Sequence, residues 1–214
     1  MQIISQALRG YRLTMTLLID LMRHGEPRGG TCYRGQLDDP LSERGWQQMR
    51  AATANAAPWD YIVSSSLRRC ADFAQTLAQQ HNIPLQLSAQ FTEIGFGDWE
   101  GKTAEQLEQH DKKAFYAFYD DPVNNTPANA EPLKDFQRRI QQAWHELLTR
   151  HSDQHILLVA HAGVIRMIVA EVLEMPLTAM FRIQVPYAAI SRIQVYRDDS
   201  KFHAQLQFHA GSLR

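Results

Sequence analysis

Cations and imidazoles directly follow apolar runs at three places in this sequence. Arg23 and His24 end one run, His161 ends a second, and Arg69 falls in the first helical turn expected after a third. Guanidinium groups bind phosphate oxygens through paired, charge-assisted hydrogen bonds, and a neutral imidazole can attack phosphorus and carry the phosphoryl group covalently. If these positions meet in the fold, they predict a phosphoryl-transfer site.

The segment FTEIGFGDWEG supplies carboxyl groups for proton transfer. A leaving alkoxide needs a proton, and a carboxyl group can supply one near neutrality when burial beside aromatic residues raises its pKa. We select Glu93 as the proton donor. Asp98 is a nearby alternative, and Glu100 is expected to brace the loop.

Three further residues are candidates for contact with substrate. Arg34 and Gln36 lie on the loop after His24, and Ala162 directly follows His161. Loops often carry binding residues, although Arg34 and Gln36 could equally be solvated.

Metal and cofactor motifs are not recognisable in the sequence. It contains no Walker loop, no HExxH and no Cys-rich ligand set. His151, His155 and His161 are close in sequence, but a helix is expected to end at the first and a strand to begin at the second, which separates them. We therefore predict catalysis without a metal or cofactor.

The elements that must position these residues follow an α/β pattern. Strands are predicted at residues 15–22, 61–63, 85–87, 156–160, 189–196 and 202–208, and helices at 43–57, 67–80, 103–119, 133–150 and from Gly163. The last two strands form a hairpin, which makes the sheet mixed and mostly parallel. In such folds ligands bind outside the carboxyl ends of parallel strands, where the candidate residues stand.

The aromatic run AFYAFYDDP permits two interpretations. Phe115, Phe118 and Tyr119 share helical spacing, which is typical of a stripe buried in the core. The same residues could instead form a lid that recognises a flat, nucleoside-like leaving group.

Composition limits the classes of protein that fit. The chain has 214 residues, 44% of them apolar, with 22 Lys and Arg against 23 Asp and Glu. This balance argues against a nucleic-acid binder, and no segment has the roughly 20 apolar residues of a membrane span. Cys32 and Cys70 fit reduced thiols in a cytoplasmic protein. We expect one domain over residues 15–214, preceded by an appendage at residues 1–14.

Four motifs in a fixed order carry a family resemblance: LMRHGEP, SSSLRRCADFA, TEIGFGDWEG and LLVAHAGVIR. Together they resemble the histidine phosphatase superfamily, also called phosphoglycerate mutase-like. The resemblance implies a three-layer α/β/α sandwich around a mixed sheet and a small-molecule phosphomonoester substrate.

Residue roles follow from the same resemblance. It implies that His24 is the phosphorylated nucleophile, that Arg23 and Arg69 hold the phosphate, that His161 completes the pocket and that Glu93 is the proton donor. The sequence departs from the family pattern in its second motif, where a serine replaces the usual proline before the leucine.

Within the family, the segments YRGQLDDPLSERG, FGDWEG and VPYAAISRI most resemble bacterial α-ribazole-5′-phosphate phosphatases of cobalamin assembly. A broad phosphatase of sugar or nucleotide phosphates and a non-catalytic phosphate-binding module are the alternatives. Phosphoglycerate mutase activity ranks lowest, because the Arg-His-Tyr-Gly signature and the longer insertion of true mutases do not occur here.

Overall fold

One six-stranded sheet forms the centre of the protein. The computed structural model describes residues 15–214 except 54–56, 198–200, 212 and 214, so the predicted appendage at residues 1–14 lies outside the described residues. The strand order is β3-β2-β4-β1-β5-β6. The strands are β1 (Met15–Arg23), β2 (Tyr61–Ser65), β3 (Leu85–Ser88), β4 (His155–Ala160), β5 (Ile190–Arg197) and β6 (Phe202–Gly211). All six predicted strands are therefore present.

Strand direction confirms a mixed, mostly parallel sheet. β1, β2, β3 and β4 run parallel, whereas β5 pairs antiparallel with β1 and with β6. Arg23 of β1 pairs with Ala160 of β4, and Ser64 of β2 pairs with Val159. The carboxyl ends of these three strands consequently lie at one edge of the sheet, where ligands bind in such folds.

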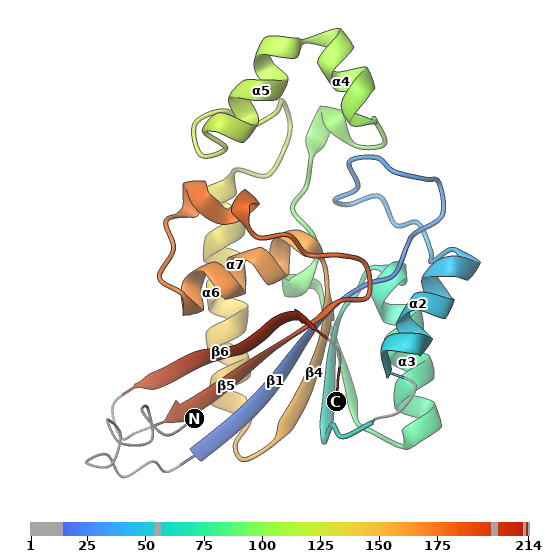
Figure 1. Ribbon diagram of the computed structural model, residues 1–214, viewed down its shortest axis with the longest axis vertical. Coiled ribbons are helices and arrows are strands. Elements are labelled where there is room, and N and C mark those ends of the chain that lie inside the picture. Colours follow the sequence, from blue (N-terminus) through green and yellow to red (C-terminus); the bar gives the residue numbers. More distant parts are fainter. Residues whose placement is uncertain (1–14, 54–56, 198–200, 212, 214) are drawn as a thin grey trace.

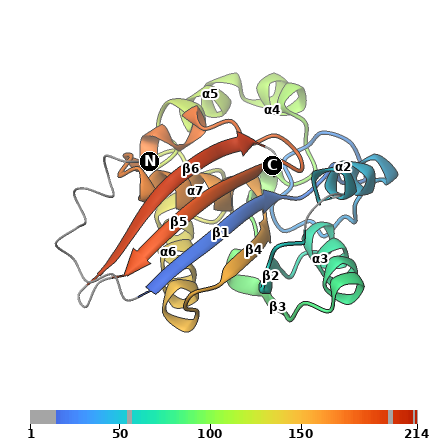
Figure 2. The ribbon, with the colours of Figure 1, turned by 60° about the horizontal axis from the view of Figure 1, so that its bottom comes forward.

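Helices cover both faces of the sheet. The four that do so are α2 (Glu43–Thr53), α3 (Arg68–His81), α6 (Leu133–Arg150) and α7 (Ala162–Val172). α2 and α3 lie on one face, and α6 and α7 on the other (Figure 1, Figure 2). Side chains of β4 alternate between them, with Ile156 and Leu158 packed in the core of α6 and α7, and Leu157 and Val159 in the core of α2 and α3. This is the three-layer sandwich expected from the sequence.

Two short helices replace the single helix expected over residues 103–119. They are α4 (Ala104–His110) and α5 (Lys112–Asp120), and they stand above the carboxyl edge of the sheet (Figure 1). The helix breaks at Asp111, which has a non-helical φ of −149° and accepts a hydrogen bond from the amide of Ala114. That expectation was wrong because an aspartate that can cap a helix also interrupts one.

The part of the chain that the structure describes also contains three short 3₁₀ helices: η1 (Ala89–Phe91), η2 (Gly97–Trp99) and η3 (Leu177–Arg182). Within the described residues, no helix combines the length and apolarity needed to cross a lipid bilayer.

A buried charge network ties β1 to its neighbours. The carboxylate of Asp20 accepts hydrogen bonds from Trp59 Nε1 at 2.9 Å, His155 Nε2 at 2.9 Å and Arg192 Nε at 2.7 Å. Burial alone would raise the pKa of Asp20, but the hydrogen bonds from His155, Arg192 and Trp59 outweigh it and lower that pKa. The network fixes β1 against β4 and β5, and with it the strand end that carries His24.

Candidate active site

A cavity of about 450 Å³ opens at the carboxyl edge of the parallel strands. Arg23, His24, Arg69 and Glu93 line this cavity. His161 lies directly behind His24, with their ring centroids 5.2 Å apart. The five main residues selected from the sequence therefore gather at one place, although they come from four separate segments of the chain.

His24 is held as a neutral imidazole with a defined tautomer. Its Nδ1 lies 2.7 Å from the carbonyl oxygen of Gly25, and a carbonyl only accepts, so Nδ1 carries the hydrogen and Nε2 carries the lone pair. Burial, followed by the charges of Arg69 and Arg23, holds the pKa of His24 well below its usual value. The imidazole is consequently available as a nucleophile.

Arg23 is fixed by an aromatic ring and a carbonyl. Its guanidinium carbon lies 4.0 Å from the centroid of the Tyr187 ring, and Nη1 donates to the carbonyl of Val185 at 2.6 Å. Among the described residues, its buried Nε has no hydrogen-bond partner. Burial lowers the pKa of Arg23, yet an arginine stays charged at any physiological pH. Arg23 therefore brings a positive charge to the site, together with at least one N–H group that is free to donate a hydrogen bond.

Arg69 is fully buried in the first turn of α3 and links the cavity to the loop after β1. Nη1 donates to the carbonyl of Leu37 at 2.6 Å and Nη2 to that of Gly35 at 2.8 Å, while Nε donates to His161 Nδ1 at 3.3 Å. One side chain thus supplies positive charge to the cavity and shapes its wall.

His161 is oriented by its two nitrogens. Because Nδ1 accepts from Arg69, Nε2 carries the hydrogen and donates to Ser65 Oγ at 2.7 Å. Burial and the charge of Arg69 hold the pKa of His161 well below its usual value, so the ring is neutral. His161 is not among the residues that line the cavity, and its contacts position Arg69 and His24.

Glu93 meets the amino end of α7. Its Oε2 accepts a hydrogen bond from the amide of Gly163 at 3.0 Å, and Oε1 accepts one from the amide of Ile94, also at 3.0 Å. A methyl group on Gly163 would overlap Oε1 and lie 3.1 Å from the carboxyl carbon. The carboxyl group therefore occupies space that only glycine at position 163 leaves free.

The loop that faces Glu93 is braced as the sequence predicted. Glu100 accepts backbone hydrogen bonds from Gly35, Gln36, Leu37 and Phe96. Four amide donors on one carboxylate hold the residues after β1 against the loop that carries Glu93.

The three predicted substrate contacts differ in their surroundings. Arg34 lines the cavity, but its Nε pairs with Asp39 at 2.7 Å and its other nitrogens donate to backbone carbonyls. Gln36 does not line the cavity, since its amide donates to the carbonyl of Glu93 at 2.7 Å. Ala162 is part of the wall.

A family model describes this arrangement of residues and elements. The model of the histidine phosphatase superfamily, branch 1, matches residues 19–206 of the chain. The chain belongs to the histidine phosphatase superfamily. The resemblance carried by the four motifs is thereby confirmed, and so is the phosphoglycerate mutase-like fold class.

Two relatives of this histidine phosphatase are named as phosphatases. An adenosylcobalamin/alpha-ribazole phosphatase of Salmonella typhimurium is 28% identical over 179 residues, covering 82% of this chain and 89% of the relative. A glucosyl-3-phosphoglycerate phosphatase of Mycolicibacterium vanbaalenii is 34% identical over 167 residues, covering 73% of this chain and 74% of the relative. The protein is accordingly a phosphoric monoester hydrolase.

Solved structures agree with the sequence comparison. The crystal structure of the alpha-ribazole phosphatase from Shigella flexneri has a TM-score of 0.78 and 27% identity, covering 91% of this chain and 96% of that one. Nearly the whole of this histidine phosphatase is therefore shared with a bacterial phosphatase of similar length.

Sequence reasoning missed several residues of the cavity wall. Arg166, Tyr187 and Tyr33 all line it, as does Tyr119, which the aromatic run indicated only as part of a possible lid. Arg166 lies one helical turn after Ala162, so its place on the same face of α7 was readable from the motif LLVAHAGVIR. Tyr33 and Tyr187 lie on loops, where residue spacing does not indicate which side chains reach the cavity.

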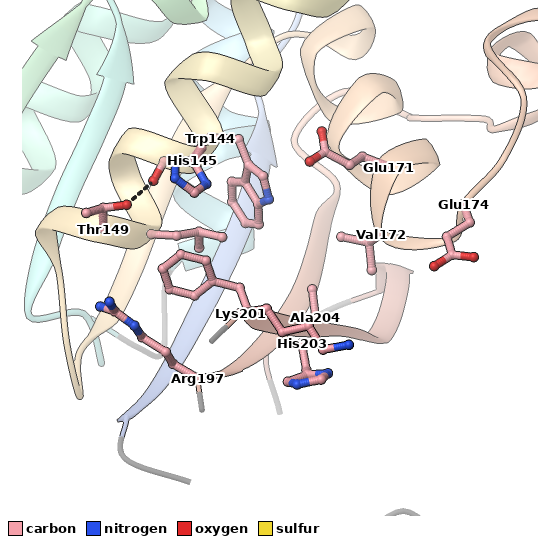
Figure 3. Close-up of a pocket in the computed structure, with 12 residues that line it drawn as sticks. Trp144, His145, Thr149, Glu171, Val172, Glu174, Arg197, Lys201, His203 and Ala204 are labelled. Atoms are coloured by element: carbon pink, nitrogen blue, oxygen red, sulfur yellow. Dashed lines mark hydrogen bonds between the residues drawn. The ribbon is translucent and has the colours of Figure 1, made fainter. Parts of the chain in front are cut away.

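A larger cavity, of about 750 Å³, lies at the other end of the sheet. Figure 3 shows its wall, formed by the second half of α6, the end of α7 and the β5–β6 pair, with Trp144, Glu171 and Arg197 around it. None of the candidate catalytic residues lines this cavity.

Proposed function

We propose that this histidine phosphatase hydrolyses phosphomonoesters through a phosphohistidine on His24, without a metal, and that α-ribazole 5′-phosphate is its substrate. The observation that carries the mechanism is the hydrogen bond from His24 Nδ1 to the carbonyl of Gly25. This bond leaves the lone pair on Nε2 of a buried, neutral ring beside two guanidinium groups.

The first half-reaction transfers the phosphoryl group to the protein. Nε2 of His24 forms a bond to phosphorus while the bond from phosphorus to the ester oxygen breaks, and the carboxyl group of Glu93 gives its proton to the leaving alkoxide. Arg23 and Arg69 neutralise the charge on the remaining phosphoryl oxygens, which is the main electrostatic task in phosphoryl transfer.

The second half-reaction returns the protein to its starting state. A water molecule attacks phosphorus, the carboxylate of Glu93 takes a proton from that water, and the bond from phosphorus to Nε2 breaks. Inorganic phosphate leaves, and both His24 and Glu93 recover their original protonation. The two arginines supply the positive charge, which is why we expect no requirement for a divalent cation.

Similarity to two proteins named as alpha-ribazole phosphatases supports the substrate. The mycobacterial relative, named as a glucosyl-3-phosphoglycerate phosphatase, makes a phosphorylated sugar acid the competing class. Comparing kcat/KM for α-ribazole 5′-phosphate, glucosyl-3-phosphoglycerate and simple sugar phosphates decides between them. A value for α-ribazole 5′-phosphate at or below the others would remove it as the substrate.

Trapping the intermediate tests the mechanism. Mixing the enzyme with ³²P-labelled substrate and quenching in alkali should give a phosphoprotein that is stable to base and labile to acid. The signal should disappear in His24→Ala, and turnover of the wild type should persist in EDTA. Phosphate binding without hydrolysis of any tested ester would instead indicate a binding module.

A further inference from the structure

The cavity has two chemically different ends. At the reaction end stand Arg23, His24, Arg69 and Glu93, whereas the remaining wall includes the rings of Tyr33, Phe96 and Tyr119. A volume of about 450 Å³ suits a whole small-molecule ligand rather than a phosphoryl group alone. The aromatic wall is therefore placed to contact the part of the substrate that becomes the leaving group.

Two tyrosines from distant segments meet in this wall. Tyr33 lies on the loop after β1 and Tyr119 near the end of α5, and their hydroxyl groups form a hydrogen bond. Tyr33 is held from behind by edge-to-face contacts with Phe96 and Trp99, at ring-centroid distances of 5.1 and 5.3 Å. It is thus a rigid part of the wall.

Tyr119 differs from its neighbours on α5 in exposure. Phe115 and Phe118 are buried, whereas Tyr119 is 41% exposed and its ring lies 5.2 Å from that of Phe181 in η3. The helix therefore combines both interpretations of the aromatic run, since its phenylalanines belong to the core while Tyr119 lines the cavity.

The charged residues of the wall favour a leaving group with hydroxyl groups over one with a second anionic group. Arg34 is neutralised by Asp39, so it offers little to a second anionic group. Arg166 lies within electrostatic reach of both Glu93 and Tyr119, which places it between the two ends of the cavity. Among the described residues, the Arg166 side chain makes one hydrogen bond, from Nε to the carbonyl of Ile183. Nη1 and Nη2 of Arg166 can therefore donate to hydroxyl groups of the substrate.

We propose that Tyr33 and Tyr119 form a leaving-group subsite that selects phosphomonoesters carrying a planar ring, an inference that rests on the proposed phosphatase function. The order along the cavity is phosphate, then a hydroxylated linker at Arg166, then the ring against the two tyrosines. Stacking on an aromatic side chain tolerates different rings because each presents a π-face. Tyr119 sets this preference, and Tyr33 holds the Tyr119 side chain in place through the hydrogen bond between their hydroxyl groups.

The test compares α-ribazole 5′-phosphate with ribose 5-phosphate, which share a primary alkoxide as leaving group and differ by the ring. The wild type should prefer the ring-bearing ester by at least tenfold in kcat/KM. Tyr119→Ala and Tyr119→Leu should lower that ratio about tenfold, mainly through a higher KM for the ring-bearing ester. Tyr119→Phe keeps the ring and loses only the hydrogen bond to Tyr33, so it should retain most of the preference.

Tyr116→Ala is the matched control, because Tyr116 lies on the same helix, is 46% exposed and hydrogen-bonds Glu108 away from the cavity. It should leave both substrates unchanged. Equal losses on both substrates in the Tyr119 variants, or no preference in the wild type, would overturn the subsite.

Calorimetry measures the binding of both esters to the wild type and to the variants. It therefore tests the subsite even if neither ester is hydrolysed. Absence of turnover rejects the proposed function, whereas ring-dependent binding that is lost in Tyr119→Leu still supports the subsite. Equal binding of the two esters rejects the subsite even if His24 is phosphorylated.

Discussion

Gly163→Ala should separate folding from catalysis in this protein. Gly163 lies in the first turn of α7 and its amide donates to Glu93 Oε2. Alanine is the better helix former by up to about 1 kcal/mol. The helix itself should therefore tolerate or favour the substitution, and the thermal midpoint should change little.

The substitution should instead displace the carboxyl group of Glu93. The new methyl group would overlap Glu93 Oε1 and lie 3.1 Å from the carboxyl carbon, so the side chain of Glu93 has to move by roughly 1 Å or rotate away. A misplacement of that size costs on the order of 100-fold in rate. We expect kcat for an alkyl phosphate to fall by about that factor while circular dichroism remains that of the wild type.

The dependence of the rate loss on the leaving group shows whether the loss comes from displacement of the acid. 4-Nitrophenyl phosphate releases an anion that needs no proton, so its hydrolysis should be much less affected by Gly163→Ala at the phosphorylation step. Gly95→Ala is the control, because a methyl group there meets Gln36 and Glu131 at ordinary contact distances of 3.5 and 3.8 Å. Equal losses in the phosphorylation rate for alkyl and nitrophenyl esters, or full activity in Gly163→Ala, would refute the placement of Glu93 as the acid.

Three further predictions concern charge. Arg69→Lys should lower kcat/KM about 100-fold, because an ammonium group cannot reproduce the separate bonds to Leu37, Gly35 and His161; steady-state kinetics checks this. The pKa of His24 is depressed by burial and by Arg69, so the nucleophile stays unprotonated as pH falls from 7.5 to about 6 and should show no NMR titration in that range. Asp20→Asn should destabilise the fold by about 3 kcal/mol at pH 7. Since the pKa of Asp20 is lowered in the folded state, its contribution is present above the ordinary carboxyl pKa and is lost as pH falls through the lowered value, so urea unfolding should show the two proteins converging below about pH 4.

The sequence was sufficient to place the reaction end of the cavity. His24 and His161 each follow an apolar strand, and parallel strands put such positions at one edge of the sheet. The two strands are neighbours, and the ring centroids lie 5.2 Å apart. Arg69 follows from the same rule. The prediction of Glu93 depended on the motif around it, because the loop that carries Glu93 is placed by hydrogen bonds to distant residues such as Gly163.

The leaving-group end could not be read in the same way. Tyr33 and Tyr119 are 86 positions apart and meet only through the fold of two loops and a helix pair. Helical spacing also hid the break at Asp111, which turns α5 so that one face is buried and Tyr119 reaches the cavity. Tertiary contacts therefore decide specificity here, whereas the pattern of strands decides chemistry.

The two ends of the cavity are nevertheless coupled through one loop. Arg69 donates to the carbonyls of Gly35 and Leu37, and Glu100 accepts from the amides of the same two residues, so a positive and a negative side chain hold this stretch of backbone. Tyr33 lies two residues before this clamped stretch. Because Arg69 shapes the loop as well as supplying charge to the phosphate site, a change that moves its guanidinium must also move the wall that contacts the leaving group. We therefore expect substrate preference and phosphoryl transfer in this protein to depend partly on the same side chain.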